Sequence, residues 1–226
     1  LAALRGQYEI WEYLHSRFPD LSLEQCGYPC RIDYGLARYM RTNWLSDASS
    51  DPAGVRKNVI NASYVYPACH LETWVYKTKE INEEKDPALL DTVIRSRMVG
   101  LFGFGARFFS HHDVVSTYPP EAIEASRRNV KDFKRYRHLL REDVYHVLPP
   151  NKDPKKWDGI EYCKRDGSEA VVLAVRGKSD EESKVFKLRG LKDNSTYAVI
   201  SFNDDTTQHV SGASLRSDGL KITLPR

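Results

Sequence analysis

The stretch LSLEQCGYPCRIDYGLARYMRTNWLSDASSDPAG, residues 21–54, decides the fold that we predict for this chain. It alternates a short apolar strand, a polar loop, a short helix, a second short strand and a second polar loop. Cys26 and Asp47 each stand where a strand gives way to a loop, 21 positions apart. One strand–helix unit has about this length, so the two side chains are expected at the ends of neighbouring parallel strands, which lie about 4.8 Å apart.

The alternation of strands and helices continues on both sides of this stretch. Short strands and repeating units of about 25 residues favour a barrel over a doubly wound sheet, and four strands make half of an eight-stranded barrel. The elements expected outside the stretch are a helix at 2–17, a helix opened by Asp51-Pro52, a strand at 71–76, a helix at 93–98, an apolar run at 99–109 and a long helix from 121 to 145.

The pattern changes after a polar, proline-containing linker at 149–156. Five strand-like runs separated by turn signals follow it, and Asp166-Gly167 is a good hairpin turn. We therefore predict an α/β plus all-β chain, in which residues 1–148 form the C-terminal half of a (β/α)8 TIM-type barrel and residues 157–226 form a small antiparallel β-sandwich. The five runs are 157–164, 169–176, 184–188, 196–202 and 220–224.

The composition is that of an ordinary globular chain, with 41% hydrophobic and 29% charged residues and a formal net charge of +3. This charge is too small to indicate nucleic acid as a partner, and we interpret the basic run at 127–141 as an outer barrel helix. No apolar run approaches the roughly 20 residues of a membrane helix. The chain starts with Leu1 inside a helical pattern, so we expect residues upstream of it and leave the compartment open.

No metal or other cofactor is predicted. Cys26 and Cys30 have CxxxC spacing, but a matching second pair of zinc ligands is missing from the sequence. His111 and His112 are adjacent on a polar loop, which makes them poor joint ligands. Free thiols and solvated histidines are the simpler interpretation.

Asp47 is the leading candidate for chemistry. A carboxylate at a strand end, flanked by Trp44, can act as a general acid when partial burial raises its pKa. The alternative is that Asp47 is a loop residue or a helix cap.

Five stretches, in the same order as here, resemble the family 36 glycoside hydrolases, the melibiase-type α-galactosidases. The first two surround the candidate site, the next two resemble the last strand and final helix of that family's barrel, and the fifth resembles the closing strands of its C-terminal β-sandwich. They are EQCGYPCRID at 24–33, WLSDASSDP at 44–52, RMVGLFGFG at 97–105, FKRYRHLL at 133–140 and GASLRSDGLKITL at 212–224.

The resemblance implies retaining hydrolysis of terminal α-linked sugars by an aspartate nucleophile and an aspartate acid/base. Asp47 matches the acid/base position. The nucleophile of the family lies in a Lys-Trp-Asp type motif on an earlier barrel strand, and no such motif precedes Asp47 in this sequence. Because a retaining glycosidase needs two carboxyl groups about 5–5.5 Å apart, the 226 residues alone are predicted to be inactive.

The resemblance also implies that an oligosaccharide or glycoside substrate contacts the loops of this stretch. Arg31 either orients Asp47 or binds a sugar hydroxyl, with a loop salt bridge as the alternative. Asp33 has similar roles, with pairing to Arg31 or a backbone cap as the alternative. Trp44 is either a core residue or pocket wall, or a stacking platform for the sugar. The residues assigned to substrate binding are Cys26, Gly27, Tyr28, Arg31, Asp33 and Trp44.

One departure from the family leaves the sugar open. Many members have three or four glycines after the cysteine, whereas this chain has Gly27-Tyr28-Pro29-Cys30. Glycine lets the backbone approach a sugar closely, and Tyr-Pro-Cys reshapes that subsite. A relative acting on another α-linked sugar and a non-catalytic carbohydrate-binding relative therefore stay as alternatives, and a homo-oligomer stays open.

Overall fold

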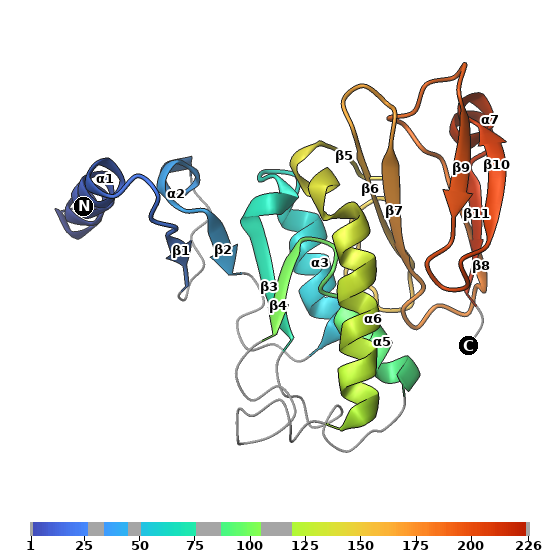
Figure 1. Cartoon of the computed structure of the whole chain (residues 1–226), viewed down its shortest axis with the longest axis horizontal. Helices are drawn as coiled ribbons and strands as arrows, with labels where there is room; N and C mark the ends of the chain where they lie inside the picture. Colours follow the sequence, from blue (N-terminus) through green and yellow to red (C-terminus); the bar gives the residue numbers. More distant parts are fainter. Residues whose placement is uncertain (1, 27–33, 45–50, 76–86, 105–118, 225–226) are drawn as a thin grey trace.

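A computed structural model describes residues 2–26, 34–44, 51–75, 87–104 and 119–224. It shows a parallel sheet with helices, followed along the chain by a region of antiparallel strands (Figure 1). No helix within the described ranges is both long enough and apolar enough to cross a membrane.

The parallel sheet has four short strands in the order in which they occur in the chain, β1-β2-β3-β4. All three pairings between neighbours are parallel. The predicted parallel α/β arrangement of this part is therefore confirmed. The strands are β1 (Glu24–Gln25), β2 (Thr42–Trp44), β3 (Leu71–Val75) and β4 (Leu101–Phe104).

Helices pack on one face of this sheet. Leu71, Thr73 and Val75 alternate along β3 and are fully buried against that helical layer, as the two-residue period of a strand requires. The α-helices of the described residues before the antiparallel region are α1 (Ala2–Arg17), α2 (Tyr34–Tyr39), α3 (Pro52–Ala62), α5 (Pro87–Arg95) and α6 (Pro120–Tyr136), and the 3-10 helices are η1 (Ala68–His70) and η3 (Arg137–Arg141).

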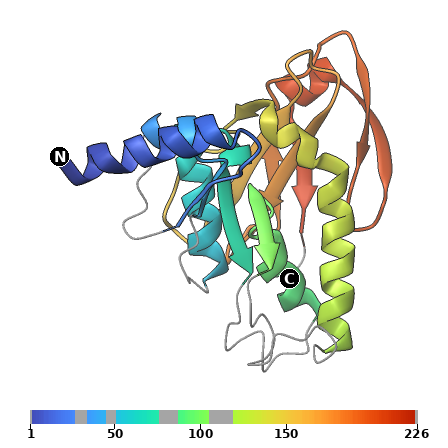
Figure 2. The ribbon, with the colours of Figure 1, turned by 60° about the vertical axis from the view of Figure 1, so that its left-hand side comes forward.

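The N-terminal helix lies at one end of the molecule, beyond β1 and α2 (Figures 1 and 2). None of its 16 residues is buried. Its contact with α2 includes an exposed ion pair between Glu12 and Arg38 at 3.2 Å. Ile10 and Tyr13 remain 60% and 62% exposed, and the half-buried Tyr8 and Trp11 pack against Tyr39 of α2.

The long helix predicted from Glu121 to Tyr145 is wrong beyond Tyr136. The chain tightens there into η3, which buries the neighbouring side chains of Leu139 and Leu140, and residues Asp143–Tyr145 form a strand, β5. The apolar residues after Tyr136 keep the spacing of a helix. The chain nevertheless forms a strand there, because β5 pairs antiparallel with β6. The helix predicted at 93–98 is also shifted, because α5 starts at Pro87 and ends at Arg95.

The antiparallel region contains one three-stranded sheet, β5-β6-β7, and two ribbons, β8-β11 and β9-β10. Antiparallel pairing was predicted here, whereas β10 and the helix α7 were not. Gly167 adopts a positive φ of 68° in the turn between β6 and β7, which favours glycine. The further elements are β6 (Asp158–Cys163), β7 (Ala170–Val175), β8 (Ser183–Phe186), β9 (Thr196–Ile200), β10 (Thr207–Ser211), α7 (Gly212–Ser217) and β11 (Leu220–Thr223).

One hydrophobic core joins these antiparallel strands. All six residues of β6 are buried, and side chains from β7 to β11 pack against the same cluster. The fully or nearly fully buried members are Trp157, Cys163, Phe186, Leu188, Leu191 and Leu215.

The two parts of the chain are packed against each other. The hydroxyl of Tyr162 on β6 donates to the carbonyl oxygen of Val99, just before β4. Val171 and Leu173 of β7 pack against the core that the helical layer builds around Phe133. The antiparallel region therefore braces the helical side of the parallel sheet.

Candidate active site

The carboxyl ends of β1 to β4 lie at one edge of the sheet, because the strands are parallel. In parallel α/β folds this edge carries the active site. In the sequence, each strand precedes a segment outside the described residues, namely 27–33, 45–50, 76–86 and 105–118.

Most of the predicted site residues fall in these segments. Asp47, Gly27, Tyr28, Arg31 and Asp33 lie outside the described residues, as do His111 and His112, so their roles stay predictions.

Two predicted residues are described at least in part. Cys26 follows β1 directly, is exposed, and forms no disulfide bond within the described part of the chain. The backbone of Trp44 forms the last residue of β2. Both positions are at the carboxyl edge of the sheet, where the sequence placed them.

The helix α3 begins at this edge and is capped as the sequence predicted. The side chain of Asp51 accepts hydrogen bonds from the backbone N–H groups of Ala53 at 3.2 Å and Gly54 at 2.8 Å, and Pro52 is the first helical residue. Asp51 comes only four positions after Asp47. The cap therefore fixes the chain immediately downstream of the candidate general acid.

A buried cation lies behind this cap. Burial lowers the pKa of the Arg97 guanidinium to about 10, the carboxylate of Asp51 acts in the opposite direction, and the Arg56 cation adds to the lowering. Arg97 stays protonated at neutral pH, since its pKa is still well above 7. Two buried arginines, Arg97 and Arg56, thus lie near the start of α3.

The sheet face opposite the helices carries a pair of acidic side chains that the sequence analysis missed. Burial raises the pKa of the Glu72 carboxyl, and a hydrogen bond with Thr42 lowers it; the charge of Glu24 and a hydrogen bond with that carboxyl raise it further. The two carboxyl groups come from β3 and β1, with Thr42 of β2 between them. An acidic residue inside the otherwise apolar run LETWVY was the available signal.

His70 and Trp74, beside the strand predicted at 71–76, are weaker sequence candidates for reaching the pocket, and a core role is the simpler interpretation for His70. The two separate in the structure. His70 precedes β3 at its amino end, and its Nδ1 donates to the carbonyl oxygen of Arg41 at 2.9 Å. It therefore lies at the end of β3 away from the carboxyl edge, and it is half-buried rather than part of the core. Trp74 is near the carboxyl end of β3, with its ring beside Gly103 of β4.

Several arginines of α6 have acidic partners within the chain. Arg127 pairs with Glu124 at 2.6 Å, and Arg128 pairs with Asp91 of α5 at 2.6 Å. These pairs fit the interpretation of α6 as an outer helix.

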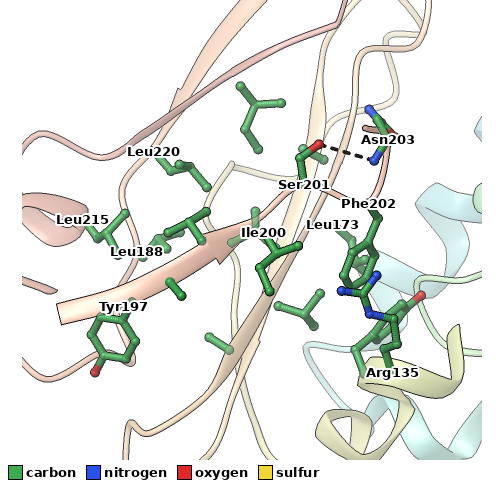
Figure 3. A pocket seen from close by; sticks show the side chains of 18 of the residues that line it. Arg135, Leu173, Leu188, Tyr197, Ile200, Ser201, Phe202, Asn203, Leu215 and Leu220 are labelled. Atoms are coloured by element: carbon green, nitrogen blue, oxygen red, sulfur yellow. Dashed lines mark hydrogen bonds between the residues drawn. The ribbon is translucent and has the colours of Figure 1, made fainter. Parts of the chain in front are cut away.

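A large cavity lies elsewhere, between the antiparallel strands and the helix α6 (Figure 3). It has a volume of about 930 Å³ and is bordered by β7 and β9, with aliphatic side chains such as Leu173 and Leu220 in its wall. Arg135 and Phe202 lie at one end, where the guanidinium stacks on the ring at 4.2 Å. Polar side chains such as Ser201, Asn203 and Gln208 line it as well, so its wall is of mixed character.

Two family models match the chain. Residues 2–142 match "Melibiase", and residues 157–226 match "Glycosyl hydrolase family 36 C-terminal domain".

Curated relatives agree with these matches. The chain is 24% identical over 220 residues to the bifunctional alpha-galactosidase/sucrose kinase AgaSK of Mediterraneibacter gnavus, covering 96% of this chain and 22% of the relative. It is 24% identical over 227 residues to alpha-galactosidase 2 of Hypocrea jecorina, covering 97% and 28%. The chain thus spans less than a third of the length of these relatives.

Solved structures show the same fold. The galactosidase domain of AgaSK superposes with a TM-score of 0.77 at 24% identity, covering 98% of this chain and 29% of that one. The family 36 alpha-galactosidase AgaA of Geobacillus stearothermophilus, solved in complex with raffinose, gives a TM-score of 0.75 at 22% identity, with the same two coverages of 98% and 29%.

Proposed function

Since this chain belongs to the melibiase family of glycosyl hydrolases, we propose that it is the part of a retaining α-glycosidase that carries the general acid/base, Asp47. The family match over residues 2–142 and the parallel strands that end beside Cys26 and Trp44 support this proposal. The complete polypeptide would hydrolyse terminal α-linked sugars, with α-galactosides as the first candidates.

We further propose that the parallel sheet is one half of a (β/α)8 barrel and that the antiparallel strands form a β-sandwich. The proposed division is 1–148 for the barrel part, 149–156 for a linker and 157–226 for the sandwich. The order of β1 to β4, each paired with the next, supports the barrel, and the shared core around Phe186 supports the sandwich.

In the proposed mechanism Asp47 works twice. It first protonates the glycosidic oxygen as the bond to the leaving group breaks, and it then deprotonates the water that releases the sugar from a covalent intermediate. The nucleophile that forms this intermediate would come from another part of the complete polypeptide. The 226 residues alone should therefore give no measurable turnover.

Substrate contacts are assigned to the loop after β1 and to the end of β2. Cys26, Gly27, Tyr28, Arg31, Asp33 and Trp44 are the proposed contact residues. AgaA, the relative solved with raffinose, was also solved with stachyose, so α-galactosyl oligosaccharides are the natural substrates to test first. The alternative is a non-catalytic carbohydrate-binding relative, and the altered Gly27–Cys30 turn is the observation that favours it.

The test is Asp47→Asn in the complete polypeptide, assayed on two substrates. Raffinose has a poor leaving group that must be protonated, whereas dinitrophenyl α-galactoside has a good one. We expect turnover of raffinose to fall about 10²–10⁴-fold, the usual contribution of a general acid, and first-step cleavage of the aryl substrate to fall far less.

The control is Asp153→Asn, which makes the same chemical change in the exposed linker, where the Asp153 side chain accepts from the Lys155 N–H at 2.9 Å. It should leave both substrates unaffected. An unmodified enzyme that binds raffinose but turns over neither substrate would support the non-catalytic alternative.

A further inference from the structure

A buried cluster of charges joins α3 to the antiparallel region. The carboxylate of Asp158, at the start of β6, accepts hydrogen bonds from Arg56 Nε and Lys57 Nζ, each at 2.7 Å. The side chains of Asp158, Arg56 and Lys57 are only 5%, 2% and 9% exposed. About a hundred residues of sequence separate the two sides of this contact, so it is a tertiary link between the two parts of the chain.

The cluster contains more positive than negative charge. Asn151 adds neutral support, since its Oδ1 accepts from Lys57 Nζ at 2.7 Å and its Nδ2 donates to Asp158 Oδ1 at 3.4 Å. Asp158 is nevertheless the one carboxylate among the described residues that pairs with these two cations. A buried cation without a counter-ion is strongly unfavourable. The position of the Asp158 carboxylate therefore determines where the side chains of Arg56 and Lys57 can lie.

Arg56 connects Asp158 to the first turn of α3 through hydrogen bonds. Its Nη1 donates to the carbonyl oxygen of Pro52 at 3.3 Å and to Ser96 Oγ at 3.1 Å. Ser96 Oγ in turn donates to the carbonyl oxygen of Thr92 at 2.6 Å, at the end of α5. The guanidinium therefore ties the start of α3 to α5 and to β6 at once.

The first turn of α3 is the described backbone immediately downstream of Asp47. Pro52 follows the Asp51 cap, and Asp47 precedes that cap by four positions. A shift or rotation of this turn would move the anchor of the segment that carries the proposed acid/base. A displacement of about 1 Å in such a group can cost on the order of 10²-fold in rate.

We propose that Asp158 is a positioning residue for catalysis, through which the C-terminal region orients α3 and thereby Asp47. The inference rests on the proposed role of Asp47 as general acid/base. It gives the antiparallel region a part in the reaction, although it lies on the helical side of the sheet, away from the carboxyl edge (Figure 1).

The test is Asp158→Asn in the complete polypeptide with the same two substrates. If Asp158 positions the acid, the rate on raffinose should fall at least about tenfold more than the rate of first-step cleavage on dinitrophenyl α-galactoside, which needs little protonation. A loss of folded protein alone would lower both rates by the same factor.

Glu161→Gln is the matched control. Glu161 is on the same strand and is fully buried, but its carboxylate accepts from the backbone N–H groups of Arg189 at 2.9 Å and Gly190 at 3.2 Å, inside the antiparallel region. The variant removes a buried carboxylate without touching α3. It should therefore change both substrates equally.

A second variant, Arg56→Lys, covers the case in which Asp158→Asn does not fold. Lysine keeps a cation for Asp158 but has no second nitrogen to reach Pro52 and Ser96 together. It should give the same preferential loss on raffinose.

Equal losses on both substrates in Asp158→Asn or, where that variant does not fold, in Arg56→Lys would overturn the positioning role. The Asp47→Asn result separates this failure from failure of the proposed function. If Asp47→Asn itself shows no preferential loss, the acid/base assignment fails. If it does and the Asp158 and Arg56 variants do not, only the positioning inference fails.

Discussion

The N-terminal end and the antiparallel region of this chain differ in how they use apolar residues. No residue of α1 is buried, and Ile10 is 60% exposed. In the antiparallel region every residue of β6 is buried, and Phe186 of β8 is 0% exposed. Both regions are rich in large apolar side chains, so composition does not explain the difference.

The comparison shows where the stability of the chain lies. Burial of apolar surface stabilises a fold by roughly 25 cal/mol per Å², and only the closed core of the antiparallel region and the helical layer gain this in full. The N-terminal end contains the first strand of the candidate site but contributes little core. Stability and the proposed chemistry therefore occupy different parts of the chain, and the charge cluster around Asp158 links them.

The largest effect is expected for Phe186→Ala, which should lower the free energy of unfolding by about 3–5 kcal/mol. The ring is fully buried, packs beside Trp157 and lies directly over Gly159. Urea unfolding followed by tryptophan fluorescence measures the change. Val185→Ala is the control on the same strand, since Val185 is 47% exposed and should cost less than about 0.5 kcal/mol. Equal effects of the two changes would contradict a closed core here.

An intermediate effect is expected from the pH dependence of Glu161. Burial raises the pKa of this carboxyl above its ordinary value of 4.5, and the N–H groups of Arg189 and Gly190 only partly offset the shift. The folded chain therefore binds the proton more tightly than the unfolded chain. This contribution to stability is full below the unfolded pKa and is lost as the pH rises through the folded pKa.

Glu161→Gln removes the ionisable carboxyl group. Comparison with the unmodified chain therefore gives the contribution of Glu161 to the pH dependence of stability. The unfolding free energy of the unmodified chain minus that of the variant should fall as the pH rises from below 4.5 to neutrality. Urea midpoints measured at several pH values give this difference. A difference that stays constant or increases with pH would show that burial does not dominate at Glu161.

The smallest effect is expected for Ile10→Ser in α1, which should change the free energy of unfolding by less than about 0.5 kcal/mol, since the side chain buries little surface in this chain. Self-association, measured by sedimentation, should decrease instead, because the variant removes an exposed apolar group. A loss of more than about 1 kcal/mol would mean that α1 contributes to the core as the antiparallel strands do.

Features that depend on a few neighbouring residues, such as helix caps and turns, could be predicted from the sequence. The cap formed by Asp51 and Pro52 and the turn at Gly167 are set by short-range geometry, and both are present. The helix predicted to run to Tyr145 failed for the complementary reason. Its apolar period continued past Tyr136, but pairing of β5 with β6 overrode that local preference.

The candidate site was also predicted in part. Cys26 and the backbone of Trp44 stand at the carboxyl edge, as the alternation of elements required. The facing carboxyl groups of Glu24 and Glu72 were missed, because they come from strands separated by β2 and no local spacing relates them.

The sequence by itself determined the parallel α/β arrangement followed by antiparallel strands, the Asp51-Pro52 cap, the turn at Gly167 and the family, since each depends on neighbouring residues or on motifs. Only the tertiary structure decided that Asp158 would meet Arg56 and Lys57. A contact between residues a hundred positions apart depends on how whole sheets and helices pack, and burial then makes their charges matter. The sequence thus identified Asp47, the residue proposed for the chemistry. Only the packing showed that Asp158 holds the start of α3, the helix that follows Asp47 in the chain.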